Sequence, residues 1–206
     1  REGLNRYNGN DIKSFKLKKN DPNSLFSNTV LRITGNKKGK VYLLCTDGIA
    51  EFDLTTQRFK TLLQGNVDAI YYNEKLYIGK REEVFVYNES TGNFDLYYHL
   101  AGKDITLSCL HLDDKKNLWM GTTGNGVYCL SENKTVSQPI TKGNITSIYE
   151  DSSKELWIGS WEEGLYHITT DGNIKNLRHD PQNPNSLCSD FVRSCCEDNA
   201  GNLWIG

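Results

Sequence analysis

A short strand motif recurs five times along this 206-residue chain, and each copy carries an aromatic residue that is usually followed two positions later by glycine. The aromatic residues are Tyr42, Tyr77, Trp119, Trp157 and Trp204, so successive copies lie 35, 42, 38 and 47 residues apart. An average near 40 residues is the length of one four-stranded blade of a β-propeller. A β-sandwich does not explain such a period, and no window shows sustained apolar spacing of the helical kind.

The residues around the motif also repeat. Carboxylate pairs precede it at Glu150-Asp151 and Glu197-Asp198, and Asp113-Asp114 stands at the equivalent place. Such pairs are compatible with acid–base catalysis or a calcium site. Because they recur at the same hairpin, we favour turn formation, in which aspartate closes an Asx turn and Gly39 or Gly201 takes a positive φ.

A longer repeat joins the two ends of the chain. Residues 27–44 align without a gap to residues 189–206, and each segment follows a Pro-Asn-Ser-Leu sequence, at 22–25 and 184–187. The two copies are 162 residues apart, which is close to four blades of about 40 residues. We therefore expect the same blade-to-blade connection to occur twice.

The predicted fold is all-β, a β-propeller of four-stranded antiparallel blades with about five blades' worth present, as part of a larger, seven-bladed ring. The whole chain, 1–206, is then one partial propeller domain. Its divisions are a half blade at 1–29, blades at 30–66, 67–105, 106–144 and 145–188, and a half blade at 189–206. We expect four complete units within it, including one at 106–139. The half blades at both ends suggest a fragment of a longer protein.

Composition narrows the function. The formal net charge of −2 gives no basic excess for nucleic-acid binding. No apolar run reaches the roughly 18 residues of a membrane helix, and the first residues do not form a signal peptide. The six cysteines include no Cys-x-x-Cys pair and the four histidines are scattered, so we expect free thiols, no metal site and no cofactor. No nucleophile elbow or phosphate loop is present either.

The repeat resembles a known family. The pattern at 180–192, 197–206 and 164–168 is similar to the two-component-regulator propeller repeat, with departures at Leu44, where the glycine belongs, and in the short hairpin before Tyr77. Such repeats form the periplasmic sensor region of hybrid two-component histidine kinases in Bacteroides-type bacteria. The resemblance implies a periplasmic location, an accompanying second propeller and β-sandwich, and glycan-derived ligands. Kinase chemistry would lie outside this chain, which is expected not to be an enzyme, and no site residue is carried over.

Candidate ligand contacts come from geometry. In a propeller, the turns between second and third strands lie at the same end as the connections between blades. Trp161 stands out because it is outside the periodic aromatic position, whereas the periodic aromatics are expected to pack between sheets. The candidate ligand-binding residues are Trp161, Glu162, Arg81, Lys80, Asn125, Arg178 and His179. Further connection residues are Asn28, Lys103, Asp104, Lys142, Asn144 and Asp190. The alternative for each is an ordinary polar loop residue.

Three functions are compatible with this sequence. The first is a ligand-sensing propeller of a membrane-anchored regulator, which binds an oligosaccharide and signals to transcription without touching nucleic acid; a homodimer is one expected assembly. The second is a protein-interaction scaffold, although the Gly-His and Trp-Asp signatures of one such family are absent. The third is a propeller glycoside hydrolase or lyase, which would need convergent acids at the channel mouth.

Overall fold

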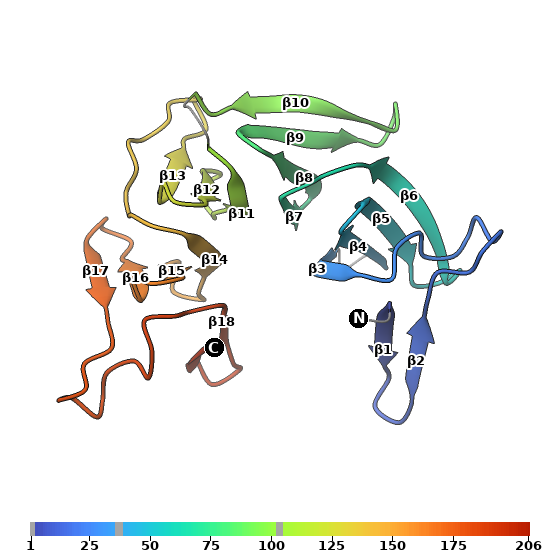
Figure 1. Ribbon diagram of the computed structural model, residues 1–206. Coiled ribbons are helices and arrows are strands. Elements are labelled where there is room, and N and C mark those ends of the chain that lie inside the picture. The colour runs from blue at the N-terminus through green and yellow to red at the C-terminus, as the bar shows by residue number, and fades with distance from the viewer. Residues whose placement is uncertain (1–2, 36–38, 102–104) are drawn as a thin grey trace. The chain divides into compact units, whose positions relative to one another are not determined.

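The computed structural model describes residues 3–35, 39–101 and 105–206, and every regular element in these ranges is a β-strand. Figure 1 shows the strands in chain order. They are β1 Leu4–Tyr7, β2 Ile12–Phe15, β3 Val30–Gly35, β4 Lys40–Cys45, β5 Gly48–Asp53, β6 Arg58–Gln64, β7 Ala69–Asn73, β8 Lys75–Lys80, β9 Glu83–Asn88, β10 Asn93–His99, β11 Leu107–Leu112, β12 Leu118–Thr122, β13 Val127–Leu130, β14 Ile145–Glu150, β15 Leu156–Ser160, β16 Leu165–Ile168, β17 Ile174–Leu177, β18 Cys195–Glu197 and β19 Leu203–Ile205. In these ranges no helix is long and apolar enough to cross a membrane.

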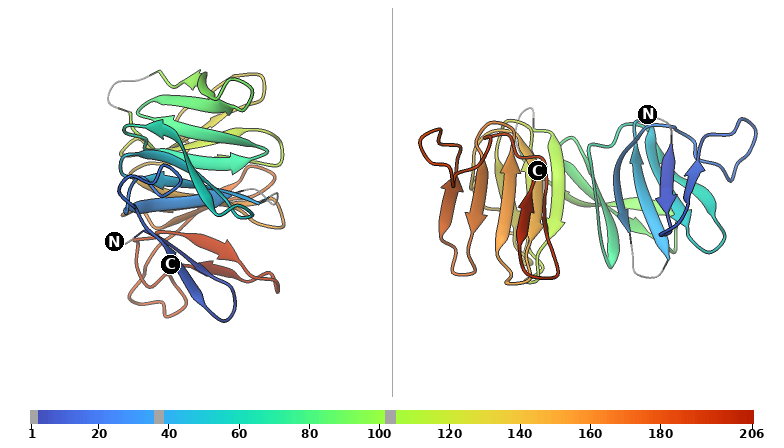
Figure 2. Two further views of the ribbon diagram at one scale, coloured as in Figure 1. Left: turned by 90° about the vertical axis from the view of Figure 1, so that its right-hand side faces the viewer. Right: turned by 90° about the horizontal axis from the view of Figure 1, so that it is seen from below.

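The chain forms two compact units, residues 1–99 and 100–206. The first unit contains the hairpin β1–β2 and two four-stranded sheets, β3–β6 and β7–β10. The second contains a three-stranded sheet, β11–β13, the four-stranded sheet β14–β17 and the hairpin β18–β19. Within each sheet, every strand pairs antiparallel with the next along the chain, which is the order of strands in a propeller blade (Figures 1 and 2). The all-β propeller prediction is confirmed.

Neighbouring sheets within a unit bury their facing side chains. In the first unit Leu43 and Phe52 lie in the core that joins β1–β2 to β3–β6, and Leu44 and Ile78 lie in the core that joins β3–β6 to β7–β10. In the second unit Ile158 packs in the core between β11–β13 and β14–β17. Burial of large apolar side chains between stacked sheets stabilises each by about 1.5–3 kcal/mol.

The glycine of the repeated motif has a packing role. A Cβ built on Gly121 would lie 2.8 Å from Cγ2 of Ile145, the first residue of β14 in the next sheet. A Cβ built on Gly159 would lie 2.9 Å from Cγ1 of Val192. Side chains of the neighbouring strand lie closer still, with Cys109 Sγ at 2.5 Å from the first position and Ser147 Oγ at 2.6 Å from the second, so the motif ends in glycine because its own sheet and the following segment leave no room for a side chain.

Aspartates close the hairpins before the tryptophans, as predicted, although the Asx-turn bond to the amide two residues on is found at Asp198, from Ala200, and the bonds at Asp113 and Asp151 come from amides four residues on. The Asp151 carboxylate accepts hydrogen bonds from the Glu155 amide at 2.9 Å and the Trp157 indole at 2.8 Å. Asp113 and Asp198 do the same for Trp119 and Trp204. Turn formation is thus the role that the structure gives to these aspartates.

The glutamates of the pairs contact the preceding hairpin. Glu150 Oε1 accepts a hydrogen bond from the amide of Asp114 at 3.1 Å, and Glu197 accepts two from Ser152, each at 2.7 Å. Carboxylates that accept bonds from backbone amides in this way link one hairpin to the next. Both members of each pair are therefore part of the framework.

Packing of the periodic aromatics follows the prediction in part. Tyr42, Tyr77 and Trp119 are buried between sheets, and Trp157 is half-buried. Trp204, on strand β19, is 62% exposed although its indole is bound by Asp198. For Trp204 the predicted burial is therefore wrong in this structure.

The long repeat reappears as a repeat of hydrogen bonds. The Leu17 amide donates to Asn28 Oδ1 at 2.7 Å, and 162 residues later the His179 amide donates to Asp190 Oδ1 at 2.7 Å. The amide of Lys18 likewise donates to Ser24, as that of Asp180 does to Ser186. The same local fold therefore forms with lysine in one copy and aspartate in the other.

The unit at 106–139 departs from the predicted four strands. Beyond β13, the chain pairs back irregularly, through an isolated bridge from Leu130 to Val136 and backbone hydrogen bonds from the Ser137 amide to the Cys129 carbonyl and from the Ile140 amide to the Val127 carbonyl, each at 2.8 Å. The Cys129 amide donates to the Ser137 hydroxyl in place of a backbone carbonyl, and Pro139 has no amide hydrogen to donate. The segment after β13 therefore lies along it without forming a regular strand, so the described sheet has three regular strands where four were predicted.

Candidate functional site

The turns and connections that we singled out meet at one end of the second unit. The Trp161 amide, directly after β15, donates to the Asn144 carbonyl at 2.9 Å. The Gly164 amide donates to the Asp190 carbonyl at 2.9 Å, and the amide of Val192 donates to the carbonyl of Ser160 at the same distance. The turn from 161 to 164 is thereby fixed to both the connection before β14 and the connection before β18. Gly164 has a φ of 74° in this turn, which glycine adopts without strain.

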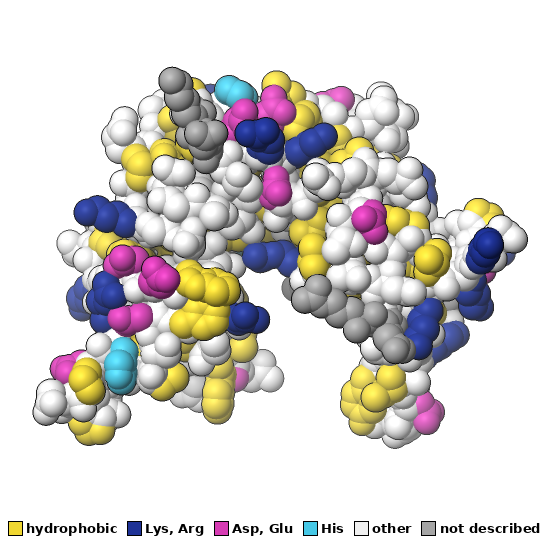
Figure 3. Space-filling model, in the orientation of Figure 1, with side chains coloured by type: hydrophobic (Ala, Val, Ile, Leu, Met, Phe, Trp, Pro, Cys, Tyr) yellow, Lys and Arg dark blue, Asp and Glu magenta, His cyan; other side chains and the backbone are white. Residues whose placement is uncertain are grey.

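Trp161 belongs to a small aromatic surface. Its ring is 47% exposed and lies edge-on to Phe191, with 4.2 Å between ring centroids and an interplanar angle of 68°. The guanidinium of Arg193 lies 5.9 Å from the Trp161 centroid and 5.2 Å from that of Phe191, within cation–π range. We call Trp161, Phe191 and Arg193 the Trp161 surface. In Figure 3 a hydrophobic patch lies over this part of the second unit, with charged side chains beside it.

Arg178 organises the charged side chains next to this surface. Its guanidinium donates to Glu163 at 2.7 Å, to Asp190 at 2.9 Å and to the Glu162 carbonyl at 2.8 Å. The hydrogen bond and charge of Asp190 raise the pKa of Arg178, so the guanidinium stays charged. The His179 amide and the Arg178 guanidinium lower the pKa of the Asp190 carboxyl.

The other predicted residues of this unit lie near the network but contribute less to it. Glu162 is exposed and only its backbone carbonyl takes part. The His179 ring is hydrogen-bonded through Nδ1 to the Leu187 carbonyl at 2.6 Å. Asn125 pairs with Gly143, whose Cα faces the Glu163 side chain.

Lys80 and Arg81 belong to the first unit. Both are exposed, Lys80 as the last residue of β8 and Arg81 in the turn that follows, where the Arg81 amide donates to Asp68 at 2.6 Å. Arg81 has a φ of 52° and its side chain pairs loosely with Glu82, at 3.6 Å. Lys80 and Arg81 therefore lie at a turn of the first unit and are not part of the Arg178 network of the second unit. The predicted connection residues Lys103 and Asp104 lie outside the described residues.

Sequence reasoning missed Phe191, Arg193 and Glu163. Val192 is 1% exposed, so its neighbours Phe191 and Arg193 point away from the core in the extended connection. In the sequence, the apolar Val192 between Phe191 and Arg193 in an extended segment could have indicated that these two side chains face outward. Glu163 carried no signal beyond its position next to Trp161.

The arrangement is suited to binding. An exposed aromatic face takes the apolar face of a sugar ring, while carboxylates and guanidinium groups bond its hydroxyls. Glu163 and Asp190 both form ion pairs with the Arg178 guanidinium, at 2.7 and 2.9 Å. Among the described residues no group of three or more His, Cys, Asp or Glu side chains is arranged to hold a metal ion, and all six cysteines are free.

One known protein family matches part of the repeat. The family described as two component regulator propeller matches residues 139–162 and 186–206, both in the second unit. No curated protein sequence matches the chain.

Solved structures share the fold over the whole chain. The extracellular domain of a protein designated a hybrid two-component system from B. thetaiotaomicron is 25% identical, with a TM-score of 0.84 over 100% of this chain and 29% of that one. A second such domain from that organism is 18% identical, with a TM-score of 0.75 over 95% of this chain and 28% of the other. This chain therefore spans less than a third of their length.

An enzyme shares the fold as well. A catalytically inactive virginiamycin B lyase from Staphylococcus aureus is 15% identical, with a TM-score of 0.71 over 95% of this chain and 67% of that one. At this identity the similarity shows the fold alone. Residues 139–162 and 186–206 thus match the two component regulator propeller family, and the chain is similar in fold to the extracellular domains of hybrid two-component systems.

Proposed function

We propose that this chain is the ligand-binding propeller region of a membrane-anchored two-component sensor, and that it binds glycan-derived oligosaccharides at the Trp161 surface. The observation that carries the proposal is the exposed, non-periodic Trp161 held beside Phe191, Arg193 and the Arg178 network. The extracellular domains similar in fold support a periplasmic location. Nothing in this role requires catalysis by the chain.

Signalling would follow from a change in domain packing. The proposed partners are a second propeller and a β-sandwich of the same full-length protein, with a homodimer as the signalling assembly. A ligand shifts such packing only by binding one arrangement more tightly than another. The amides of Gly164 and Val192 form hydrogen bonds between the turn that carries Trp161 and the connection before β18. A ligand that displaces the Trp161 surface would therefore also displace that connection.

Isothermal titration of the full ectodomain against a panel of neutral and acidic oligosaccharides tests this proposal. We expect saturable heat for at least one member and loss of that heat in Trp161→Ala. Absence of heat across the panel, with protein that melts cooperatively, would reject direct sensing of glycans.

A further inference from the structure

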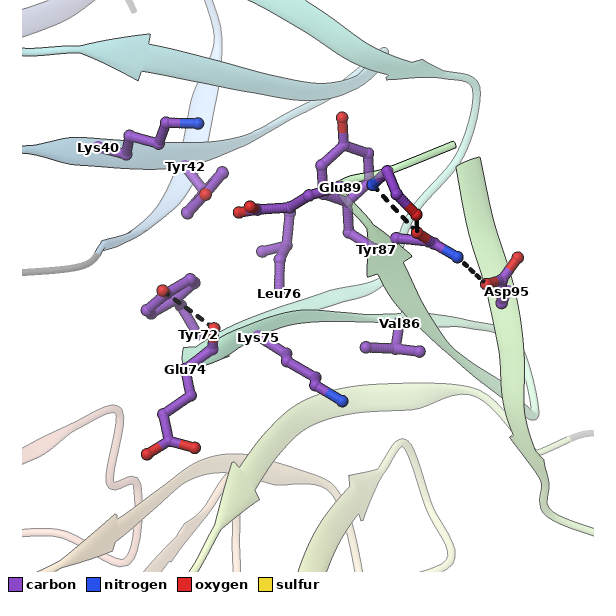
Figure 4. A pocket seen from close by; sticks show the side chains of 12 residues that line it. Lys40, Tyr42, Tyr72, Glu74, Lys75, Leu76, Val86, Tyr87, Glu89 and Asp95 are labelled. Atoms are coloured by element: carbon purple, nitrogen blue, oxygen red, sulfur yellow. Dashed lines mark hydrogen bonds between the residues drawn. The ribbon is translucent and has the colours of Figure 1, made fainter. Parts of the chain in front are cut away.

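A second candidate site lies in the first unit, far along the chain from Trp161. It is a cavity of about 690 Å³ at the hairpin end of the sheets β3–β6 and β7–β10 (Figure 4). Three tyrosines line it, Tyr42 from β4, Tyr72 from β7 and Tyr87 from β9. This volume is within the range of sites for small molecules.

Tyr42 is the unusual member of the lining. It is 1% exposed and its ring stacks on Tyr72, with 5.2 Å between centroids and 18° between planes. Tyr72 donates its own hydroxyl to the Glu74 carbonyl at 3.1 Å. No residue that the structure describes forms a hydrogen bond with the Tyr42 hydroxyl, whereas buried tyrosine hydroxyls usually have a partner. That hydroxyl is available to a molecule in the cavity.

The charges around the cavity favour a cation. Its lining includes three carboxylates, Glu74, Glu89 and Asp95, against two ammonium groups. One of those two, Lys40, is already bonded to the Glu51 carboxylate at 3.1 Å, and Glu51 adds a fourth negative charge. An anionic ligand would meet net repulsion here, and a cationic one net attraction.

The tyrosines add to this preference. Aromatic faces attract ammonium groups, and a low-dielectric wall strengthens that attraction. Burial, with the nearby Glu51 and Glu89 carboxylates, raises the pKa of Tyr42, so its phenol stays neutral and can both donate and accept a hydrogen bond. A ligand that carries hydroxyls as well as an ammonium group would use both features.

We propose that this cavity binds a small hydroxylated organic cation, of the class of a hexosamine with a free ammonium group, with the Tyr42 hydroxyl and the Glu89 carboxylate as contacts. The site is separate from the Trp161 surface. The proposal of a cation site in this cavity does not depend on oligosaccharide binding at the Trp161 surface.

Calorimetric titration of the full chain with glucosamine, N-acetylglucosamine and glucuronate tests the proposal. These three sugars are cationic, neutral and anionic. We expect glucosamine to bind at least ten times more tightly than the other two, with Tyr42→Phe and Glu89→Gln each weakening it fivefold or more. Tyr77→Phe is the matched control, since it removes a hydroxyl from a buried tyrosine of the neighbouring sheet β7–β10 that does not line the cavity, and it should leave binding unchanged.

Three outcomes would overturn the proposal: no saturable heat with glucosamine, equal affinity for all three sugars, or unchanged affinity in both Tyr42→Phe and Glu89→Gln. Glu89 is exposed, so its variant keeps the test valid if Tyr42→Phe disturbs the core. Trp161→Ala should leave glucosamine binding intact, which separates this site from the Trp161 surface.

Discussion

The indole nitrogen of Trp157 donates a 2.8 Å hydrogen bond to Asp151, six residues earlier, and the pairs Trp119–Asp113 and Trp204–Asp198 repeat this bond at the same length. Each aspartate also accepts bonds from amides of its own hairpin. The repeated tryptophan therefore does more than fill space between sheets. It connects the second strand of a blade to the turn that precedes it.

Breaking this bond where it is buried should cost stability. Asp113 is 6% exposed, and Asp113→Ala leaves the Trp119 indole and the Asn117 amide without their acceptor. We expect a loss of about 2–4 kcal/mol in the free energy of unfolding by urea, because unsatisfied buried donors cost about 1–3 kcal/mol each. Asp114→Ala, at the exposed neighbouring position, is the control and should change stability far less. Equal losses in the two variants would contradict the assigned role of Asp113.

The motif glycine should resist substitution by alanine. Gly159→Ala places a methyl group 2.6 Å from the Ser147 hydroxyl and 2.9 Å from Val192. We expect about 1–3 kcal/mol of destabilisation by overpacking, measured by thermal or urea unfolding. Gly172→Ala is a useful comparison, because it has open space around it and tests only the cost of its positive φ. A Gly159→Ala protein as stable as the parent would show that the next sheet does not press on this strand.

Acid should destabilise the fold through a small set of aspartates. Hydrogen bonds from the Trp204 indole and Asn202 lower the pKa of Asp198, and those from His179 and Arg178 lower that of Asp190. A carboxyl whose pKa is lower in the folded state stabilises it above the unfolded pKa of about 3.9 and loses that contribution as the pH falls toward the folded pKa. The melting temperature should therefore fall as the pH drops below about 4.

The double variant Asp190→Asn, Asp198→Asn checks this assignment. Its melting temperature should depend less on pH between about 5 and 3 than that of the parent, since two of the titrating groups are gone. An unchanged slope would mean that other carboxyls control acid unfolding.

Local sequence patterns were enough to predict the blades and their hairpins. The aspartates, glycines and aromatics at fixed spacing act within one blade or on its neighbour, so the repeat carries their roles. The lack of a regular fourth strand after β13 could not be predicted in the same way, because there the Ser137 hydroxyl accepts the hydrogen bond of the Cys129 amide in place of a backbone carbonyl. Side-chain competition of this kind leaves no periodic trace.

The candidate site was predictable only in outline. Trp161 stood outside the repeat and Arg178 lay in a connection, so both could be nominated from sequence. Their contacts with Phe191, Arg193 and Glu163 depend on how non-repeating connections pack, which period and composition do not encode. The Tyr42 hydroxyl could not be nominated from the sequence as a ligand contact. Tyr42 occupies the periodic aromatic position, which predicts packing between sheets, and only the folded structure shows that it lines a cavity.

Arg178 offers a way to separate ligand binding from folding. Arg178→Gln removes the donor that holds Glu163 and Asp190 beside Trp161, while the residue itself is exposed. We expect oligosaccharide affinity to fall by about tenfold, which corresponds to about 1.4 kcal/mol of binding free energy, with a nearly unchanged melting temperature. Arg58→Gln, at an exposed arginine on β6 of the first unit, is the control for loss of a positive charge. A variant that binds normally would leave Arg178 without a role in recognition.

The most direct test of the sensing proposal is the dissociation constant of the full ectodomain for its best oligosaccharide, compared between the parent, Trp161→Ala and Tyr7→Ala. Tyr7 is an exposed aromatic of the first unit, at 68% exposure, and serves as the control. We predict that Trp161→Ala weakens binding at least tenfold and that Tyr7→Ala has no effect. Equal affinity of the parent and Trp161→Ala proteins for that oligosaccharide would contradict a ligand site at Trp161.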